Sequence, residues 1–424
     1  MKRLSVTFGF VTALLFAATM FLASCSKSDD SKEAVTDYTE EKSNVYSDGG
    51  PTESLADEAM PGVPGGSSGT GQGGNTQAGV VTAGEWSDLG NWTFWAGLMQ
   101  SEDFSDKSSY WMCYTNNRVA VKVTDPSGNP LAGISVKLQR QTDDGIRTLW
   151  EAVTDNHGLA DCWAGLWQQE NFDASALSIS VDGQQMEGHP SLTSWEAPEQ
   201  MTVNTYAVTP ATAPDMQTDI AFVVDATGSM SDEIDFLKND LTDIINQVKE
   251  LRPDQTIRTA ALFYRDEGDE YLTRHSDFTA DVTTTKDFVG NQQADGGGDY
   301  PEAVHTALEK MLTDLSWNGK ARTRLAFMLL DAPAHHETDI IASLQESVAR
   351  CARQGIRLIP VAASGVDKNT EFMLRFFSIT TGGTYVFLTN DSGVGLDHIA
   401  ASVGDYEVEQ LNRLLIRLIK QYTE

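Results

Sequence analysis

The sequence predicts a doubly wound α/β domain that follows an all-β sandwich and a disordered N-terminal stalk. In the C-terminal half, unbroken apolar runs such as residues 220–224 alternate with helical patterns, as in parallel sheets covered by helices on both faces. In the middle, short alternating apolar and polar segments are separated by Gly, Pro and Asn turns, which is typical of a sandwich. Near the N-terminus, Gly/Ser-rich sequence has too few large apolar residues to form a core.

Charge restricts the class of partner. The 424 residues include 61 acidic and 30 basic side chains, which give a formal net charge of −31. Nucleic acid is excluded as an expected partner, because phosphate binding needs clustered Lys and Arg. Divalent cations and basic partners suit this charge better, although acidity also serves solubility.

Residues 1–24 have the features of a targeting segment. Lys2 and Arg3 precede the mostly apolar residues 4–22, and "LASC" ends at Cys25. This pattern resembles the lipobox of bacterial lipoproteins, which implies that Cys25 is lipidated and anchors the chain in the outer membrane of the cell envelope. The alternative is an ordinary signal peptide with a chance cysteine. The following "SKSDDSKE" resembles a surface-export signal, and a solvated tether explains it equally well.

Residues 25–83 are predicted to be a flexible linker and residues 84–117 a Trp-rich segment. The clustered tryptophans of that segment are Trp86, Trp92, Trp95 and Trp111. They could form a glycan-binding platform or cover a sheet edge or a domain junction. We favour the second interpretation, because large aromatic side chains are mostly buried.

Residues 118–208 are predicted to form the β-sandwich, and the Pro/Ala/Thr-rich residues 209–218 a linker. The pattern "VTDPSGNPLAGISVKL" followed by "TDNHGLAD" resembles carboxypeptidase-regulatory-like or bacterial immunoglobulin-like modules. That resemblance implies a spacer or docking surface. Cys113 and Cys162 lie in the same region and could form a disulfide in an oxidising envelope.

Residues 219–424 are predicted to form the α/β domain. Residues 231–251 place apolar side chains on one helical face. Residues 256–266, 323–331 and 356–364 are expected as strands, with residues 271–279 as a hairpin partner at the sheet edge. Helices are expected within residues 283–294, 296–315, 339–355 and 408–422.

Oxygen-bearing side chains follow the predicted strands. Ligands of open parallel sheets bind at the carboxyl ends of the strands, so the loops there are expected to converge. The candidate ligands are Asp225, Thr227, Ser229, Asp299 and Asp331. Their hard oxygens suit a divalent cation, Mg²⁺ first, with Mn²⁺ or Ca²⁺ as alternatives.

The order of these residues resembles the von Willebrand factor type A domain and its metal-ion-dependent adhesion site. The family's Asp-x-Ser-x-Ser motif matches Asp225, Thr227 and Ser229, and its later aspartate matches Asp331. The segments "YRDEGDE" and "GGGDYPEA" resemble the bacterial and hemicentin-like subgroup. The resemblance implies that Asp225 and Asp331 hold the ion while an acidic residue of a partner protein completes its coordination.

One position departs from the integrin-like pattern, which has a threonine in the second loop where this sequence has Asp299. A third carboxylate would bind the metal tightly but weaken its attraction for acidic ligands, or would serve to hold the loops. The alternative role of Asp299 is an N-cap for the helix that follows Pro301. His335 and His336 are expected to be polar residues at a helix entry. Near the same rim, Arg265, Asp266 and Asp269 are expected to form ion pairs or to support the ligands.

The sequence therefore predicts a cell-envelope lipoprotein, not an enzyme, that binds a protein partner non-covalently through a divalent cation. The first alternative is a scaffold or assembly subunit of an envelope complex with a structural metal. A metal-dependent hydrolase is a weaker alternative, because no nucleophile elbow, HExxH or Walker motif is present.

Overall fold

The computed structural model describes residues 78–170, 172–394 and 400–424. The predicted signal peptide, Cys25 and nearly all of the predicted linker lie outside the described residues. The described residues all fall within one compact unit, Gln72–Glu424. None of the helices in this part of the chain has the length and apolarity that a membrane span requires.

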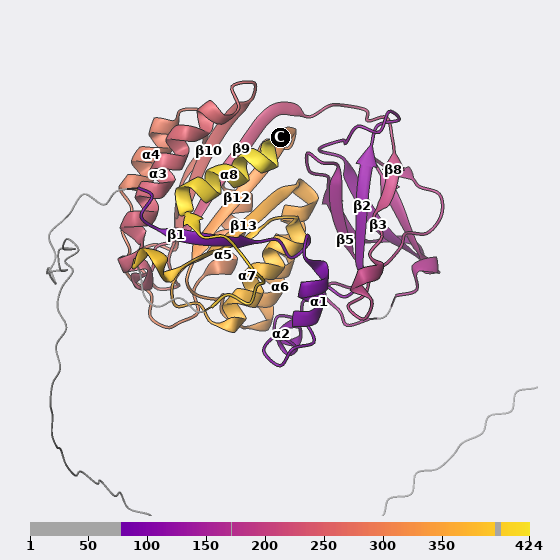
Figure 1. The fold of residues 1–424 in the computed structure, drawn as a ribbon, viewed down its shortest axis with the longest axis horizontal. Coiled ribbons are helices and arrows are strands. Elements are labelled where there is room, and N and C mark those ends of the chain that lie inside the picture. Colours follow the sequence, from indigo (N-terminus) through magenta and orange to yellow (C-terminus); the bar gives the residue numbers. More distant parts are fainter. Residues whose placement is uncertain (1–77, 171, 395–399) are drawn as a thin grey trace, which may run out of the picture. The chain divides into compact units, whose positions relative to one another are not determined.

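The large sheet has eight strands in the order β11-β10-β9-β12-β13-β14-β1-β15 (Figure 1). In that order the strands are Thr273–Thr279, Thr256–Tyr264, Asp215–Asp225, Ala321–Leu330, Ile356–Ala362, Tyr385–Leu388, Thr82–Trp86 and Glu409–Gln410. The strands from β10 to β14 are parallel, whereas β11, β1 and β15 pair antiparallel at the two sides. The mixed α/β sheet and the edge position of residues 271–279 confirm those predictions.

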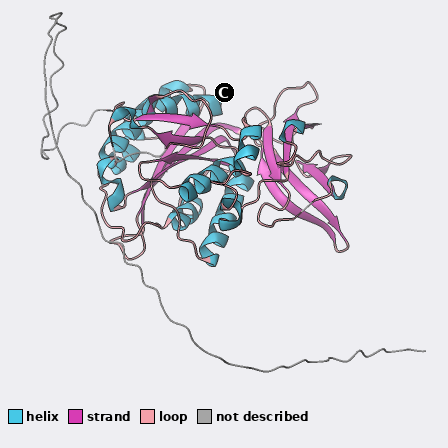
Figure 2. Cartoon of the chain, turned by 60° about the horizontal axis from the view of Figure 1, so that its bottom comes forward, coloured by secondary structure: helices cyan, strands magenta, loops and turns pink. Residues whose placement is uncertain are grey.

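Helices cover both faces of this sheet (Figure 2). On one face lie α3 (Ile234–Leu251), α4 (Val282–Gly290) and α8 (Leu411–Thr423), and on the other α5 (Val304–Thr313), α6 (Thr338–Gln354) and α7 (Lys368–Thr381). The central strand β9 serves both, because Phe222 packs with the first group and Val223 with the second. The unbroken apolar run of β9 follows from this double burial.

Strand β1 joins the sheet from far away in the sequence. Ala83 pairs with Leu388 and Trp86 with Tyr385, so the indigo β1 runs beside the last segment of the chain in Figure 1. Just before β1, the backbone N–H of Gly79 donates to Asp240 Oδ1 of α3 at 2.6 Å. The predicted boundary between residues 83 and 84 therefore falls inside a strand of the large sheet.

Two small β-sheets lie between β1 and β9 in the sequence, with the strand orders β5-β2-β8 and β4-β3-β6-β7. The first contains Leu159–Trp163, Arg118–Thr124 and Asn204–Ala207, and the second contains Gly145–Val153, Ser135–Thr142, Leu177–Val181 and Gln184–Gln185. Their pairs are antiparallel, as the alternating pattern predicts, except that β8 runs parallel to β2. Short 3-10 helices lie at Ala174–Ala176, Pro198–Gln200, Gly228–Asp232 and Asn390–Ser392.

The Trp-rich segment contains α1 (Trp92–Leu98) and α2 (Lys107–Tyr110) and lies between the small sheets and α7. Trp95 stacks on Phe372 of α7 with ring centroids 5.8 Å apart, and Trp111 Nε1 donates to the Asn369 carbonyl at 3.0 Å. Trp92 instead packs against Trp163 of β5, with centroids also 5.8 Å apart. The buried rings confirm the interpretation of a covered junction.

The proposed disulfide is wrong in this structure, since Cys113 and Cys162 are both free thiols. Both side chains are fully buried in the same apolar cluster. Burial raises the pKa of each thiol, which keeps both in the neutral form that packs as a small apolar group.

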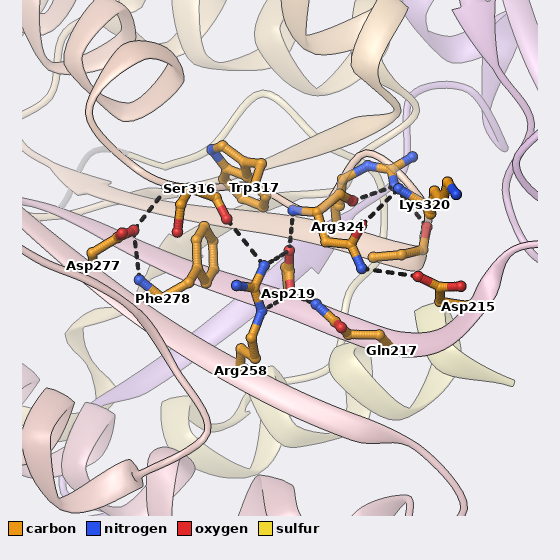
Figure 3. A network of polar contacts seen from close by, with 12 residues as sticks. Asp215, Gln217, Asp219, Arg258, Asp277, Phe278, Ser316, Trp317, Lys320 and Arg324 are labelled. Atoms are coloured by element: carbon orange, nitrogen blue, oxygen red, sulfur yellow. Dashed lines mark hydrogen bonds and ion pairs between the residues drawn. The ribbon is translucent and has the colours of Figure 1, made fainter.

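The amino end of β9 is fixed by a buried carboxylate (Figure 3). Asp219 accepts two hydrogen bonds from Arg258, at 2.9 and 2.6 Å, and one from the backbone N–H of Asn318 at 2.8 Å. Arg258 also lies over the Phe278 ring of β11. The bidentate pair links β9, β10 and the loop before β12 at the end of the sheet opposite the candidate ligands.

A second buried ion pair connects the Trp-rich segment to α7. The fully buried Arg375 donates to Asp88 through Nη2 at 2.6 Å and Nε at 3.0 Å, and to Glu371 at 3.2 Å. Arg375 Nη1 also donates to the Ser402 carbonyl at 2.6 Å. Three segments distant in sequence therefore share one guanidinium.

We expect Arg375→Met to lower the free energy of unfolding by about 3–5 kcal/mol, because it leaves the buried Asp88 without a cation and Glu371 with Lys368 alone. Denaturant titration of the full chain measures this loss. The control is Arg353→Met, which removes an exposed pair with Glu346 and should cost less than about 1 kcal/mol. Equal losses in the two variants would contradict the role given to Arg375.

Asp240 should make stability depend on pH. Burial raises the pKa of Asp240 from 3.8 to about 6, and the hydrogen bond from Gly79 only partly opposes this. The stabilisation from a raised carboxyl pKa is present below about pH 4 and is lost as pH rises through about 6. Asp240→Asn stays neutral, so relative to wild type it should gain roughly 2 kcal/mol between pH 4 and pH 8.

Thermal or denaturant unfolding at both pH values tests this expectation. Asp287→Asn, an exposed change on α4, is the matched control and should follow the wild-type profile. A profile for Asp240→Asn parallel to that of wild type would show that the buried carboxyl does not cause the dependence.

Candidate metal centre

The first loop of the candidate site begins where β9 ends. Asp225 and Thr227 are fully buried, and Asp225 Oδ1 accepts from the Thr227 backbone N–H at 2.9 Å and from its hydroxyl at 2.7 Å. The Thr227 hydroxyl also lies 3.2 Å from Ser229 Oγ, and Ser229 is exposed. A line of three oxygen-bearing side chains thus leads from the sheet to the surface.

The second loop, residues 291–303, packs closely against the first loop. The Gly228 N–H donates to the Gly296 carbonyl at 3.1 Å, and a Cβ at Gly228 would lie only 2.8 Å from that oxygen. Gly297 has φ +73°, and a Cβ there would lie 3.0 Å from Glu302 Oε1 and 3.3 Å from Thr227 Cβ. The glycines therefore let the second loop approach Thr227 and Glu302 closely.

The third loop follows β12 and holds Asp331, which is 7% exposed. It is joined to the second loop, because the Glu302 N–H donates to the Pro333 carbonyl at 2.8 Å and Glu302 forms a parallel bridge with Ala334. The three loops border a cavity of about 370 Å³. Its lining residues are Ser229, Gly296, Gly297, Gly298, Asp299, Tyr300, Glu302, Asp331, Ser364 and Gly365.

The carboxyl groups of this site lie close enough to repel one another. Burial, reinforced by Asp331, raises the pKa of Asp225 to about 7. Burial also raises the pKa of Asp331 to about 6, against the opposing effect of the Ser229 hydroxyl. For Glu302, burial and the nearby carboxylates of Asp225, Asp266 and Asp331 raise the pKa to about 9. A positive charge placed among these three groups would lower their pKa values again.

The orphaned oxygens of these groups fit a divalent cation. Asp225 Oδ2, Asp331 Oδ1 and Glu302 Oε2 are buried and have no hydrogen-bond partner. Unpaired buried carboxylate oxygens are costly, whereas Mg²⁺, Mn²⁺ and Ca²⁺ prefer such oxygens. Among the described residues, no three His, Cys, Asp or Glu side chains lie close enough together to hold a metal ion without further ligands. The hydroxyls of Thr227 and Ser229 supplement the carboxylates here.

Four of the five predicted ligands, namely Asp225, Thr227, Ser229 and Asp331, are brought together. Asp299 is exposed and lies on the rim of the cavity. It is not an N-cap either, because α5 begins at Val304 and its N-cap residue is Ala303. The buried carboxylate of the second loop belongs to Glu302, which sequence reasoning missed. Its place three residues after Asp299, before an apolar helix, was the available signal.

Polar neighbours brace the rim. His335 Nε2 lies 2.9 Å from Asp266 Oδ1, and His336 stacks on Tyr110 of the Trp-rich segment at 3.6 Å between ring centroids. The buried Arg265 also supports these loops, because it donates to the carbonyls of Ala226 and Gln293, at 3.1 and 2.9 Å. In the same region, Asp269 Oδ2 accepts from the Gly297 N–H at 2.9 Å. These contacts fix the loops around the cavity, in the supporting role predicted for this segment.

Residues 219–359 match the family model described as von Willebrand factor A domain. This part of the chain is therefore a von Willebrand factor A domain, a class of domain that often binds divalent cations.

Among curated proteins, the chain is similar to the ariadne-like RING finger protein R811 of Acanthamoeba polyphaga mimivirus, with 32% identity over 121 residues. It also resembles the alpha-protein kinase vwkA of Dictyostelium discoideum, with 22% identity over 202 residues. These alignments cover 28% and 47% of this chain, and only 12% and 32% of the relatives. Among solved structures, the conserved hypothetical protein BatB from Bacteroides thetaiotaomicron aligns with a TM-score of 0.34 and 11% identity, over 48% of this chain and 98% of BatB.

We expect Glu302→Gln to weaken Mg²⁺ binding by about tenfold or more, because it removes a buried carboxylate from the candidate ligands. Isothermal titration with Mg²⁺ measures the affinity. Asp299→Asn should have a smaller effect, and Glu309→Gln, an exposed change on α5, is the matched control. A larger loss in Asp299→Asn than in Glu302→Gln would return the second-loop ligand to Asp299.

Proposed function

We propose that this chain is a cell-envelope lipoprotein that binds a protein partner non-covalently through a divalent cation held by its von Willebrand factor A domain. Mg²⁺ is the ion we assign first, with Mn²⁺ or Ca²⁺ as alternatives, because all candidate ligands are hard oxygens.

The observation that carries the proposal is the group of unpartnered oxygens on Asp225, Asp331 and Glu302. When bound, the cation supplies positive charge and an open coordination position. Asp225 and Asp331 would hold it, and the Thr227 and Ser229 hydroxyls would complete the set on the first loop. Because Ser229 and Asp331 both line the cavity, a partner oxygen can approach from that side.

The arrangement suits binding better than catalysis. The Thr227 hydroxyl donates to Asp225, and Ser229 lies next to it. Hydroxyls held among carboxylates in this way are suited to ligating a cation.

A scaffold subunit with a structural metal is the second candidate function. It is favoured by the stacking of His336, from the loop after β12, on Tyr110 of the Trp-rich segment. The same segment reaches the loop that follows β5 of a small sheet, since the Tyr114 N–H donates to the Leu166 carbonyl at 2.7 Å. An ion that fixes the loops would then also fix how the small sheets are held.

The remaining parts of the chain fit display from a membrane. Lipid on Cys25 would anchor the protein in the outer membrane, the Gly/Ser-rich sequence that follows Cys25 would provide reach, and the two small sheets, as a β-sandwich, would act as a spacer.

Capture of partners from envelope extract by the full-length protein tests metal-dependent binding. We expect partners to be retained in Mg²⁺ and lost in chelator, and Asp225→Ala to lose them even in Mg²⁺. The control is Asp143→Ala, at the exposed turn between β3 and β4. Partners that stay bound under all conditions would reject metal-mediated adhesion and favour the scaffold.

A further inference from the structure

Carboxylates dominate the edge of the sheet around the metal centre. The loops at residues 265–272, 291–303 and 331–337 hold four, three and two Asp or Glu residues, respectively, and Arg265 is their single Arg or Lys. Five of these side chains are exposed, and we name them the acidic rim: Glu267, Glu270, Asp295, Asp299 and Glu337.

The acidic rim is held in place by the fold. The Asp295 N–H donates to the Ala226 carbonyl at 3.0 Å, and the Gly297 N–H donates to Asp269 at 2.9 Å. The loops that carry the rim are thus hydrogen-bonded to the loops that carry the candidate ligands. A partner that reaches the ion must meet the rim as well.

Cations of the protein itself neutralise only part of the rim. Glu270 pairs with Arg274 at 3.1 Å, and Arg265 lies 4.0 Å from Glu270 and 3.9 Å from Asp295. Across the described residues, no ion pair within 4.0 Å involves Glu267, Asp299 or Glu337. Three exposed carboxylates therefore remain available to a partner.

The ion itself would not offset the negative charge of the acidic rim. Its two positive charges would face the carboxylates of Asp225, Asp331 and Glu302, which have orphaned oxygens and are 0%, 7% and 3% exposed. A further carboxylate from a partner would add negative charge beside these three buried carboxyl groups and the acidic rim. A neutral oxygen, from a carbonyl, hydroxyl or amide, meets no such repulsion.

An aromatic ring completes the rim. Tyr300 is 44% exposed, and its hydroxyl accepts from the Asp367 N–H at 3.0 Å and lies 3.2 Å from Thr370 Oγ1. The ring is therefore fixed beside the cavity with much of its surface open. A fixed exposed ring among carboxylates suits a lysine or arginine side chain.

We propose that the partner recognised at the metal centre is a cationic protein segment, which gives a neutral oxygen to the ion and lysine or arginine side chains to the acidic rim and Tyr300. The proposal rests on the proposed function and replaces the acidic ligand that the resemblance implies. Opposite charge across such an interface raises the association rate and excludes acidic competitors.

Two labelled peptides test the proposal with the full chain in Mg²⁺, one alternating lysine and serine and the other alternating glutamate and serine. We expect the lysine peptide to bind at least about tenfold more tightly, and to weaken as salt is added. Neutralising the rim with Glu267→Gln, Asp299→Asn and Glu337→Gln together should weaken it about tenfold.

The matched control removes the same charge from the small sheets, through Asp143→Asn, Asp144→Asn and Glu187→Gln together. The proposal is overturned if the glutamate peptide binds as tightly, if neither peptide binds, or if both triple variants behave alike. Chelator and Asp225→Ala test the proposed function separately. A lysine preference that survives both would support the cationic partner and reject the role of the metal.

Discussion

The crowding of three buried carboxyl groups is the constraint on which the loops at the carboxyl ends of the strands depend. Asp225, Asp331 and Glu302 come from three loops, and each would be more stable apart from the others. What holds them together is the backbone: glycines that permit close approach, and hydrogen bonds from Gly228 to Gly296 and from Glu302 to Pro333. Assembling this anionic pocket lowers the stability of the fold. Such a loss is typical of functional sites at which a bound ligand restores the stability.

At the opposite end of the sheet, a buried aspartate has a purely structural role, and the protein provides all of its partners. Asp219 is as buried as Asp225, but Arg258 and the Asn318 N–H satisfy both of its oxygens. Two equally buried aspartates of one strand thus differ in whether the protein itself provides a cation for them. The contrast supports a functional origin for the unpaired oxygens of Asp225, Asp331 and Glu302.

Much of this could be predicted from the sequence because the signals are local. The apolar run before Asp225, the short spacing to Ser229 and the aspartate after β12 define strands and their ends within a few residues. Glu302 and Asp299 could not be ranked in this way, since which of them is buried depends on contacts with Thr227 and Pro333. Likewise, the five residues of β1 carry no sign of a partner strand 300 residues later.

The pairing of β1 with β14 has a consequence for the order of folding. The sheet cannot be completed until the segment around Leu388 exists, although Ala83, its partner, is synthesised far earlier. Contacts of such sequence separation are slow to form, and unpaired strand edges favour aggregation meanwhile. A fragment that starts at the matched domain, residue 219, would lack this strand permanently and leave β14 as an open edge. The pairing of β1 therefore completes the sheet of a domain whose candidate metal ligands lie much later in the sequence.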